Sequence, residues 1–226
     1  MKIPERFEKI KKEIENFSYS VNRSTPPQII AVSKYHTSDA ISEAINSGMR
    51  IFGESRINEG LKKFTPFFQK NIPFELHHIG PLQKGSLRNL LTIYSYTHGA
   101  GSISSIQELL KQCLKKKYKF NYFLQLNLTA EDTKSGFSET DAVAILKKQQ
   151  EFNNDYCTLC GLMTMGPSNM DEEISRKVFQ KLCKIRNDYF ANGKLSMGMS
   201  GDYKIAIAEG ADYVRIGTAI FGEREA

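Results

Sequence analysis

The regular alternation of short apolar segments with longer segments of helical periodicity is the feature that most constrains this fold. The apolar runs predict eight strands, at 29–33, 51–53, 74–79, 92–96, 120–128, 157–163, 195–197 and 212–216. Helical patterns are expected at 4–17, 39–48, 57–68, 82–91, 104–117, 139–152, 171–190 and 203–209. An unbroken series of such units predicts a parallel sheet. Eight strands predict closure into a (β/α)8, or TIM, barrel, with a doubly wound open sheet as the alternative.

Composition is that of a globular chain and gives no sign of a second domain. The 226 residues, 40% of them hydrophobic and 25% charged, are typical of one folded domain over 1–226. We expect no membrane partner, because no run reaches the roughly 20 apolar residues of a bilayer span and the N-terminal segment lacks an apolar signal core. The net charge of +6 is spread along the chain, so no nucleic acid is expected either.

The cysteines and histidines predict structural roles and no metal. Cys157 and Cys160 have the spacing of half a zinc site, but no second such pair follows. On a strand, residues three apart face opposite sides, so these thiols should diverge as free thiols in a reducing cytoplasm. His77 and His78 are adjacent on the third predicted strand and should also face opposite ways. We expect these two and His98 to be satisfied structural histidines.

A lysine follows the first predicted strand, in the segment AVSK at 31–34. In a barrel of this kind, chemistry gathers where the strands end. Lys34 should therefore reach the barrel mouth, where loss of hydration favours the neutral amine. A neutral amine condenses with aldehydes. The alternative interpretation is an edge lysine whose amine reaches water.

Glycines and hydroxyls follow the seventh and eighth predicted strands. Segment 197–203 carries Met199 and Ser200, and segment 215–218 carries Gly217 and Thr218. The loops at these two positions are the recurrent phosphate site of such barrels. An ordinary helix cap would explain either loop alone, but the two together predict a phosphate site.

A reactive lysine and a phosphate site predict one ligand that carries both an aldehyde and a phosphate. Pyridoxal 5′-phosphate (PLP) is the common ligand of this kind. Arg215 would then lie beside the pyridine nitrogen of PLP and, being always charged, keep that nitrogen unprotonated. Such a partner weakens the ring as an acceptor of electrons.

Several motifs together resemble one known family. They are AVSK (31–34), FGE (52–54), HHIGPLQ (77–83), QLN (125–127), KSGF (134–137), GLM (161–163), SMGMSGDY (196–203) and VRIGTAIFG (214–222). The chain resembles, nearly end to end, the pyridoxal phosphate homeostasis proteins, or YggS/PROSC family. The resemblance implies the barrel of the alanine racemase N-terminal domain, a fold-type III PLP fold, without that enzyme's second domain. It implies these cofactor-binding residues: Lys34 for the aldimine, Ser200, Gly217 and Thr218 for the phosphate, Met199 in the same loop as Ser200, and Arg215 for the pyridine nitrogen.

The sequence departs from the family pattern on the second to fourth predicted strands and their loops. Ser55 replaces an Asn, Gly85 and Ser86 replace an Asn-Lys pair, Gly101 lies where an Asp is usual, and Leu76 replaces an aromatic residue. All of these positions are expected to lie away from the phosphate site.

The function implied is intracellular homeostasis of PLP, which the protein would hold and pass to PLP-dependent apo-enzymes, as a monomer or weak dimer and without evident catalysis. The alternative is an amino-acid racemase-like PLP enzyme. Racemisation needs acid–base groups on both faces of the substrate. Lys34 serves one face only, and in alanine racemase the opposite base comes from the second domain.

Overall fold

The fold is a closed parallel barrel, as the strand count predicts, and is described here from a computed structural model that covers residues 1–129, 131 and 134–223. The strands, each hydrogen-bonded to the next and β8 to β1, are β1 (Gln28–Val32), β2 (Ile51–Glu54), β3 (Glu75–His78), β4 (Tyr96–Ala100), β5 (Phe120–Gln125), β6 (Cys157–Met163), β7 (Lys194–Met199) and β8 (Tyr213–Ile216). The open-sheet alternative is therefore wrong.

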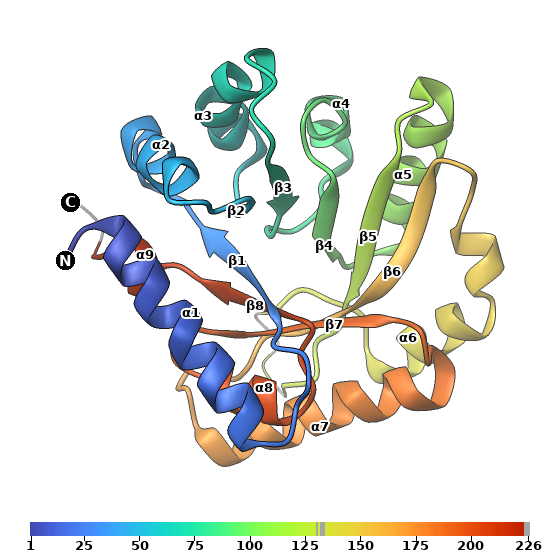
Figure 1. Cartoon of the computed structure of the whole chain (residues 1–226). Coiled ribbons are helices and arrows are strands. Elements are labelled where there is room, and N and C mark those ends of the chain that lie inside the picture. The colour runs from blue at the N-terminus through green and yellow to red at the C-terminus, as the bar shows by residue number, and fades with distance from the viewer. Residues whose placement is uncertain (130, 132–133, 224–226) are drawn as a thin grey trace.

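Helices surround this barrel on its outer side (Figure 1). They are α1 (Ile3–Ser20), α2 (Ser38–Asn46), α3 (Ile57–Gln69), α4 (Leu87–Leu90), α5 (Ile103–Lys116), α6 (Glu139–Lys147), α7 (Glu172–Tyr189), α8 (Tyr203–Ala208) and α9 (Thr218–Phe221). Two short 3-10 helices, η1 (Lys84–Ser86) and η2 (Gln149–Phe152), interrupt the connections before β4 and before β6. The helix α1 packs against α2, α8 and α9, so it covers the side of the barrel.

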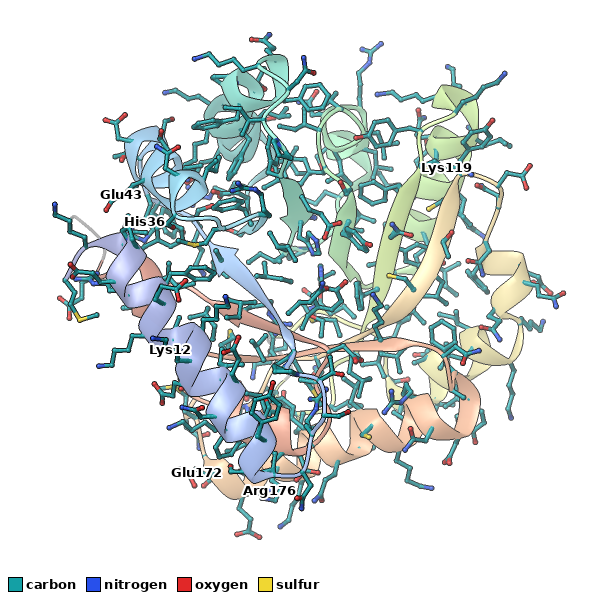
Figure 2. The ribbon with its side chains drawn as sticks, viewed as in Figure 1. Lys12, His36, Glu43, Lys119, Glu172 and Arg176 are labelled. Atoms are coloured by element: carbon teal, nitrogen blue, oxygen red, sulfur yellow. The ribbon has the colours of Figure 1, made fainter. Side chains whose placement is uncertain are left out.

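Two apolar layers hold the barrel together. The larger one lies between the sheet and the helices and includes Ile41, Phe64 and Leu182, all fully buried. A smaller cluster around Ile30 and Phe123 fills the barrel interior. Successive strand residues point alternately into these two layers. Side chains fill both of them, while the labelled Lys12 and Glu172 lie exposed on the outer helices (Figure 2).

The fourth strand differs from the sequence prediction. The apolar run at 92–96 was expected to form it, but β4 begins only at Tyr96. Ile93 and Tyr94 are buried in the layer under the helices, so this run supplies core residues from a connection. Residue 99 of β4 has no room for a side chain, because the preceding loop crosses it closely: a Cβ there would lie 1.8 Å from the carbonyl oxygen of Gly80. The glycine in this strand therefore reflects the space that a neighbouring backbone needs.

The helix expected at 82–91 is also shorter than its pattern. Only η1 and the single turn of α4 form there. Within the described residues, every helix is too short or too polar to traverse a bilayer.

Candidate functional site

The pairing of β1 with β8 assembles the barrel mouth. Ala31 lies opposite Ile216 in this register, so the segments that follow the two strands leave the sheet side by side. Lys34 follows on one side and is half-buried, while Gly217 and Thr218 follow on the other. A Cβ at Gly217 would lie 3.4 Å from the carbonyl oxygen of Val32, which shows how close the two loops are.

The loop after β7 lies at the same end of the barrel. Met199 lies opposite Arg215 in the pairing of β7 with β8. Met199 and Ser200 are both exposed there. The buried carboxylate of Asp202 accepts a hydrogen bond from the Met199 backbone N–H at 2.6 Å and fixes the loop. Gly198, with φ of +89°, lies within β7 where the pairing with β8 changes register, a conformation that favours glycine.

Arg215 is the buried cation below these loops. Its Nη1 donates to Ser196 Oγ at 2.7 Å, and its Nη2 donates to the backbone carbonyl of Thr164 at 3.0 Å. Burial lowers the pKa of Arg215 to about 10, with Asp202 acting in the opposite direction. The guanidinium therefore stays charged at neutral pH. The structure thus brings all six residues expected at the site to one end of the barrel.

A buried ionic cluster that sequence reasoning missed supports the Lys34 segment. Lys63 of α3 donates to the backbone carbonyl of Ser33 at 2.9 Å, to Glu54 Oε1 at 3.0 Å and to Glu59 Oε1 at 2.5 Å. The Ser33 hydroxyl donates to the same Glu54 oxygen at 2.7 Å. Glu59 also accepts from the backbone N–H of Tyr35 at 2.8 Å. These hydrogen bonds therefore hold the backbone in place on both sides of Lys34, at Ser33 and at Tyr35.

Burial raises the pKa of Glu54, and Lys63 and Ser33 act against that shift. The second oxygen of Glu54, Oε2, is buried and has no hydrogen-bond partner among the described residues. The only sequence signal of this cluster is the spacing of Glu59 and Lys63, four residues apart on a helix. Such pairs are common on exposed surfaces, so the spacing alone does not indicate burial.

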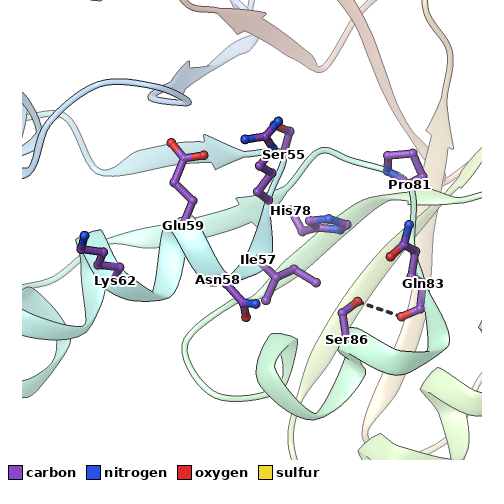
Figure 3. Close-up of a pocket in the computed structure, with 10 residues that line it drawn as sticks. Ser55, Ile57, Asn58, Glu59, Lys62, His78, Pro81, Gln83 and Ser86 are labelled. Carbon is purple, nitrogen blue, oxygen red and sulfur yellow. Dashed lines mark hydrogen bonds between the residues drawn. The ribbon is translucent and has the colours of Figure 1, made fainter.

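A cleft of about 690 Å3 opens beside this cluster, between α3 and η1 (Figure 3). Ser55, His78 and Ser86 line it, and the Ser86 hydroxyl donates to the carbonyl of Gln83 at 2.8 Å. Two of the positions at which the sequence departs from the family pattern, Ser55 and Ser86, therefore share one cleft. This cleft contains none of the six residues expected to bind PLP.

The histidines of β3 face opposite sides, as expected. His78 points toward the helix layer, where its Nδ1 lies 2.9 Å from Thr97 Oγ1, and burial lowers its pKa to about 4. His77 points into the barrel and contacts His98, which was expected to be a satisfied structural histidine. Cys160 also faces the barrel interior, whereas Cys157 lies in the outer layer, so these two thiols diverge as predicted. Among the described residues, no group of His, Cys, Asp or Glu has the arrangement of a metal site.

Comparison with known proteins agrees with this geometry. The profile of the family described as "Alanine racemase, N-terminal domain" matches residues 8–225. The pyridoxal phosphate homeostasis protein of Aquifex aeolicus is 32% identical over 203 residues, which make up 88% of this chain and 87% of that relative. The structure of PipY from Synechococcus elongatus without PLP has a TM-score of 0.85 at 26% identity, over 98% of this chain and 100% of PipY. The structure of PipY with PLP bound has a TM-score of 0.83.

Alanine racemase of Clostridium difficile shares the fold, with a TM-score of 0.68 at 14% identity, over 95% of this chain and 56% of the racemase. The closed barrel and the profile together define a protein of the alanine racemase N-terminal domain class. Within that class, the chain belongs to the family of pyridoxal phosphate homeostasis proteins. The resemblance inferred from the motifs is thereby confirmed.

The ionic cluster behind Lys34 leads to a stability prediction. Lys63→Met leaves Glu54 buried without its cation, so we expect a loss of about 3–5 kcal/mol in the free energy of unfolding. The pKa of Glu54 is already raised in the folded state, and losing Lys63 raises it further. A raised carboxyl pKa means that stability falls as pH rises from about 4.3, the unfolded value, through the folded value. The deficit should therefore shrink as pH is lowered, in urea titrations between neutral pH and pH 5.

Lys62→Met is the matched control, because Lys62 is the exposed neighbour on the same helix. It should change the free energy of unfolding by no more than about 0.5 kcal/mol. An equal loss in both variants, or a Lys63→Met deficit that does not change with pH, would contradict the buried pairing.

Proposed function

We propose that this chain binds PLP covalently and reversibly through Lys34 and keeps it available in the cell without using it in a reaction. The donor set of the barrel mouth fits the three functional parts of PLP. Lys34 offers an amine for the aldehyde, the hydroxyls of Ser200 and Thr218 and the open backbone at Gly217 suit the phosphate, and Arg215 suits the pyridine nitrogen. PLP supplies, when bound, an aldehyde that condenses with amines and a ring that can take up electron density.

The burial and the charge of Arg215 are the observations that support the non-catalytic part of the proposal. Its guanidinium is buried and remains charged, and a guanidinium can only donate hydrogen bonds. A pyridine nitrogen beside it would remain a neutral acceptor. The ring would then withdraw electrons weakly from a bound amino acid, so loss of the α-proton would be slow.

The names of the relatives support the same proposal. The curated relatives are called pyridoxal phosphate homeostasis proteins, and PipY has a structure with PLP bound. We extend the proposal to delivery of PLP to apo-enzymes by a monomer or weak dimer in the cytoplasm. The four free thiols, Cys113, Cys157, Cys160 and Cys183, support a reducing compartment.

The first prediction of this proposal concerns Lys34. Purified protein should gain visible absorbance when PLP is added, and Lys34→Ala should remove that absorbance while leaving the circular dichroism spectrum unchanged. Borohydride reduction followed by peptide mapping should find the pyridoxyl group on Lys34. Lys134 is the internal comparison, since its Nζ is engaged with Glu131 and the Gly166 carbonyl. A label on Lys134 or Lys84 would refute the assignment.

The second prediction concerns the phosphate. Ser200→Ala combined with Thr218→Val should weaken binding of PLP far more than binding of pyridoxal, because only PLP carries the group that these hydroxyls would bind. Each hydrogen bond to the charged phosphate that is lost should cost about 1.5–3 kcal/mol, or roughly 10- to 150-fold in affinity. Fluorescence titration with both ligands measures the ratio. Equal weakening of the two ligands would show that the phosphate lies elsewhere.

The third prediction separates the carrier from a racemase-like enzyme, which the shared barrel fold keeps as the second candidate. In deuterated water, PLP-loaded protein should shift its absorbance on addition of L-alanine, because the amino acid competes with Lys34 for the aldehyde. The Cα–H signal of alanine should persist in proton NMR over hours. Rapid loss of that signal, abolished in Lys34→Ala, would identify an enzyme instead.

A further inference from the structure

A line of polar side chains crosses the otherwise apolar interior of the barrel. Ser196 Oγ, which accepts from Arg215, lies 2.9 Å from His98 Nδ1. His98 Nε2 lies 2.8 Å from His77 Nδ1, and His77 Nε2 lies 2.7 Å from Glu75 Oε1. The five residues come from β8, β7, β4 and β3. They lead from the mouth, where Arg215 lies, to the first residue of β3 at the opposite end.

The middle of this line is closed to water. His77, His98 and Ser196 have no exposed surface, and Arg215 is 4% exposed, whereas 36% of the Glu75 side chain is exposed. The His98 ring stacks on Phe123 with 4.2 Å between centroids, and the His77 ring stacks on Tyr96 at 4.3 Å. Each imidazole is therefore packed on an aromatic ring while both of its nitrogens face partners in the line.

Burial disfavours the charged form of both histidines. Burial lowers the pKa of His77, with Glu75 opposing and Lys194 reinforcing the shift. Burial also lowers the pKa of His98, and the neighbouring His77 and Arg215 act in the same direction. A neutral imidazole has one nitrogen that donates and one that accepts. The position of the proton on one ring therefore determines its position on the other ring, and all hydrogen bonds of the line run in one direction.

The Glu75 end of the line sets the direction, and the Arg215 end is compatible with it. At the mouth, Arg215 can only donate, so Ser196 Oγ accepts from it and its own proton is free for His98 Nδ1. At the far end, the Glu75 carboxylate can only accept, so His77 Nε2 must carry the proton. His77 Nδ1 then accepts from His98 Nε2–H, and His98 Nδ1 accepts from Ser196. A single arrangement satisfies every bond, with all protons directed from the cation toward the carboxylate.

We propose that Ser196, His98, His77 and Glu75 form one directed hydrogen-bond chain that orients Arg215 from below, with Glu75 fixing its direction from the opposite end of the barrel. The part that concerns ligand binding rests on the proposed function, because Arg215 meets a pyridine nitrogen only if PLP binds. The direction of the chain does not depend on it. All four are positioning residues, since Arg215 is the member of the line that would touch the ligand.

The first test needs no ligand and no variant. Nitrogen-15 NMR of the histidine side chains, at neutral pH and without PLP, should find His77 and His98 both neutral and both protonated at Nε2. A proton on Nδ1 of either ring, or a doubly protonated ring, would overturn the proposal. His78 is an internal reference, because its ring lies in the helix layer outside the chain.

The second test changes the far end. Glu75→Met removes the acceptor and retains an unbranched side chain of similar length, so His77 should show both tautomers and the His98 nitrogen signals should shift as well. Glu75→Gln keeps an oxygen that accepts and should restore the wild-type tautomers. Asp155→Asn removes a carboxylate from the exposed turn that precedes β6, at the same end of the barrel, and should change neither ring. Unchanged His98 signals in Glu75→Met would overturn the role of Glu75.

The third test joins the chain to the ligand. Ser196→Ala removes the acceptor of Arg215 Nη1, so PLP and pyridoxal should both bind about tenfold more weakly, with their ratio unchanged. Ser200→Ala combined with Thr218→Val should change that ratio, so contacts to the phosphate can be distinguished from contacts to the pyridine nitrogen. Unchanged affinity for both ligands in Ser196→Ala would overturn the orienting role. Failure of wild-type protein to bind either ligand would instead refute the proposed function, and the tautomer result would stand apart from it.

Discussion

The hydrogen-bonded ladder between β1 and β8 is the contact on which the candidate site depends. It joins the first strand to the last, with Ile30 opposite Arg215 and Ala31 opposite Ile216. Without it, the Lys34 segment and the loops after β7 and β8 would belong to opposite edges of an open sheet. Closure therefore unites Lys34, two hydroxyl-bearing loops and a buried cation, which come from distant parts of the sequence.

This arrangement requires polar groups to be buried, and the barrel stabilises them in two different ways. Behind Lys34, charges of opposite sign are paired directly, through Lys63 with Glu54 and Glu59. Inside the barrel, the Arg215 charge is met by neutral groups, the Ser196 hydroxyl and the Thr164 carbonyl. The direct hydrogen-bond partners of Arg215 are neutral, and Asp202 is the charged group that counteracts the effect of burial on its pKa. Direct ion pairs suit a group whose task is to hold backbone in place.

Much of this fold could be predicted from the sequence, because the strands of a closed parallel barrel are nearly continuous apolar runs. The run at 29–33 and the following lysine are placed as expected. The run at 92–96 misled the prediction, since an apolar segment that packs beneath helices has the same composition as a strand. Gly99 contributed to that error, because a glycine is unusual within a strand, and the reason for this one is the close approach of the Gly80 backbone, which a local pattern does not show.

The candidate site was predictable where its residues lie at strand ends or directly after them. Lys34, Gly217 and Thr218 could be found in this way. Lys63 could not, because it lies inside a helix and its burial depends on the neighbouring strands. His98 has no local signal either: whether a strand residue faces inward is set by register, and the register of β4 follows from contacts that the sequence does not show.

The order in which the chain is synthesised adds a consequence of the β1–β8 ladder. Contacts between strands far apart in the sequence are slow to form, because much of the intervening chain must be ordered to bring them together. On the ribosome, Lys34 is made well before Arg215, Gly217 and Thr218. A nascent chain that has not yet reached β8 therefore carries Lys34 without the residues that lie beside it in the barrel. The mouth can form only after β8 has been made, and a product truncated before β8 would contain Lys34 but not the mouth.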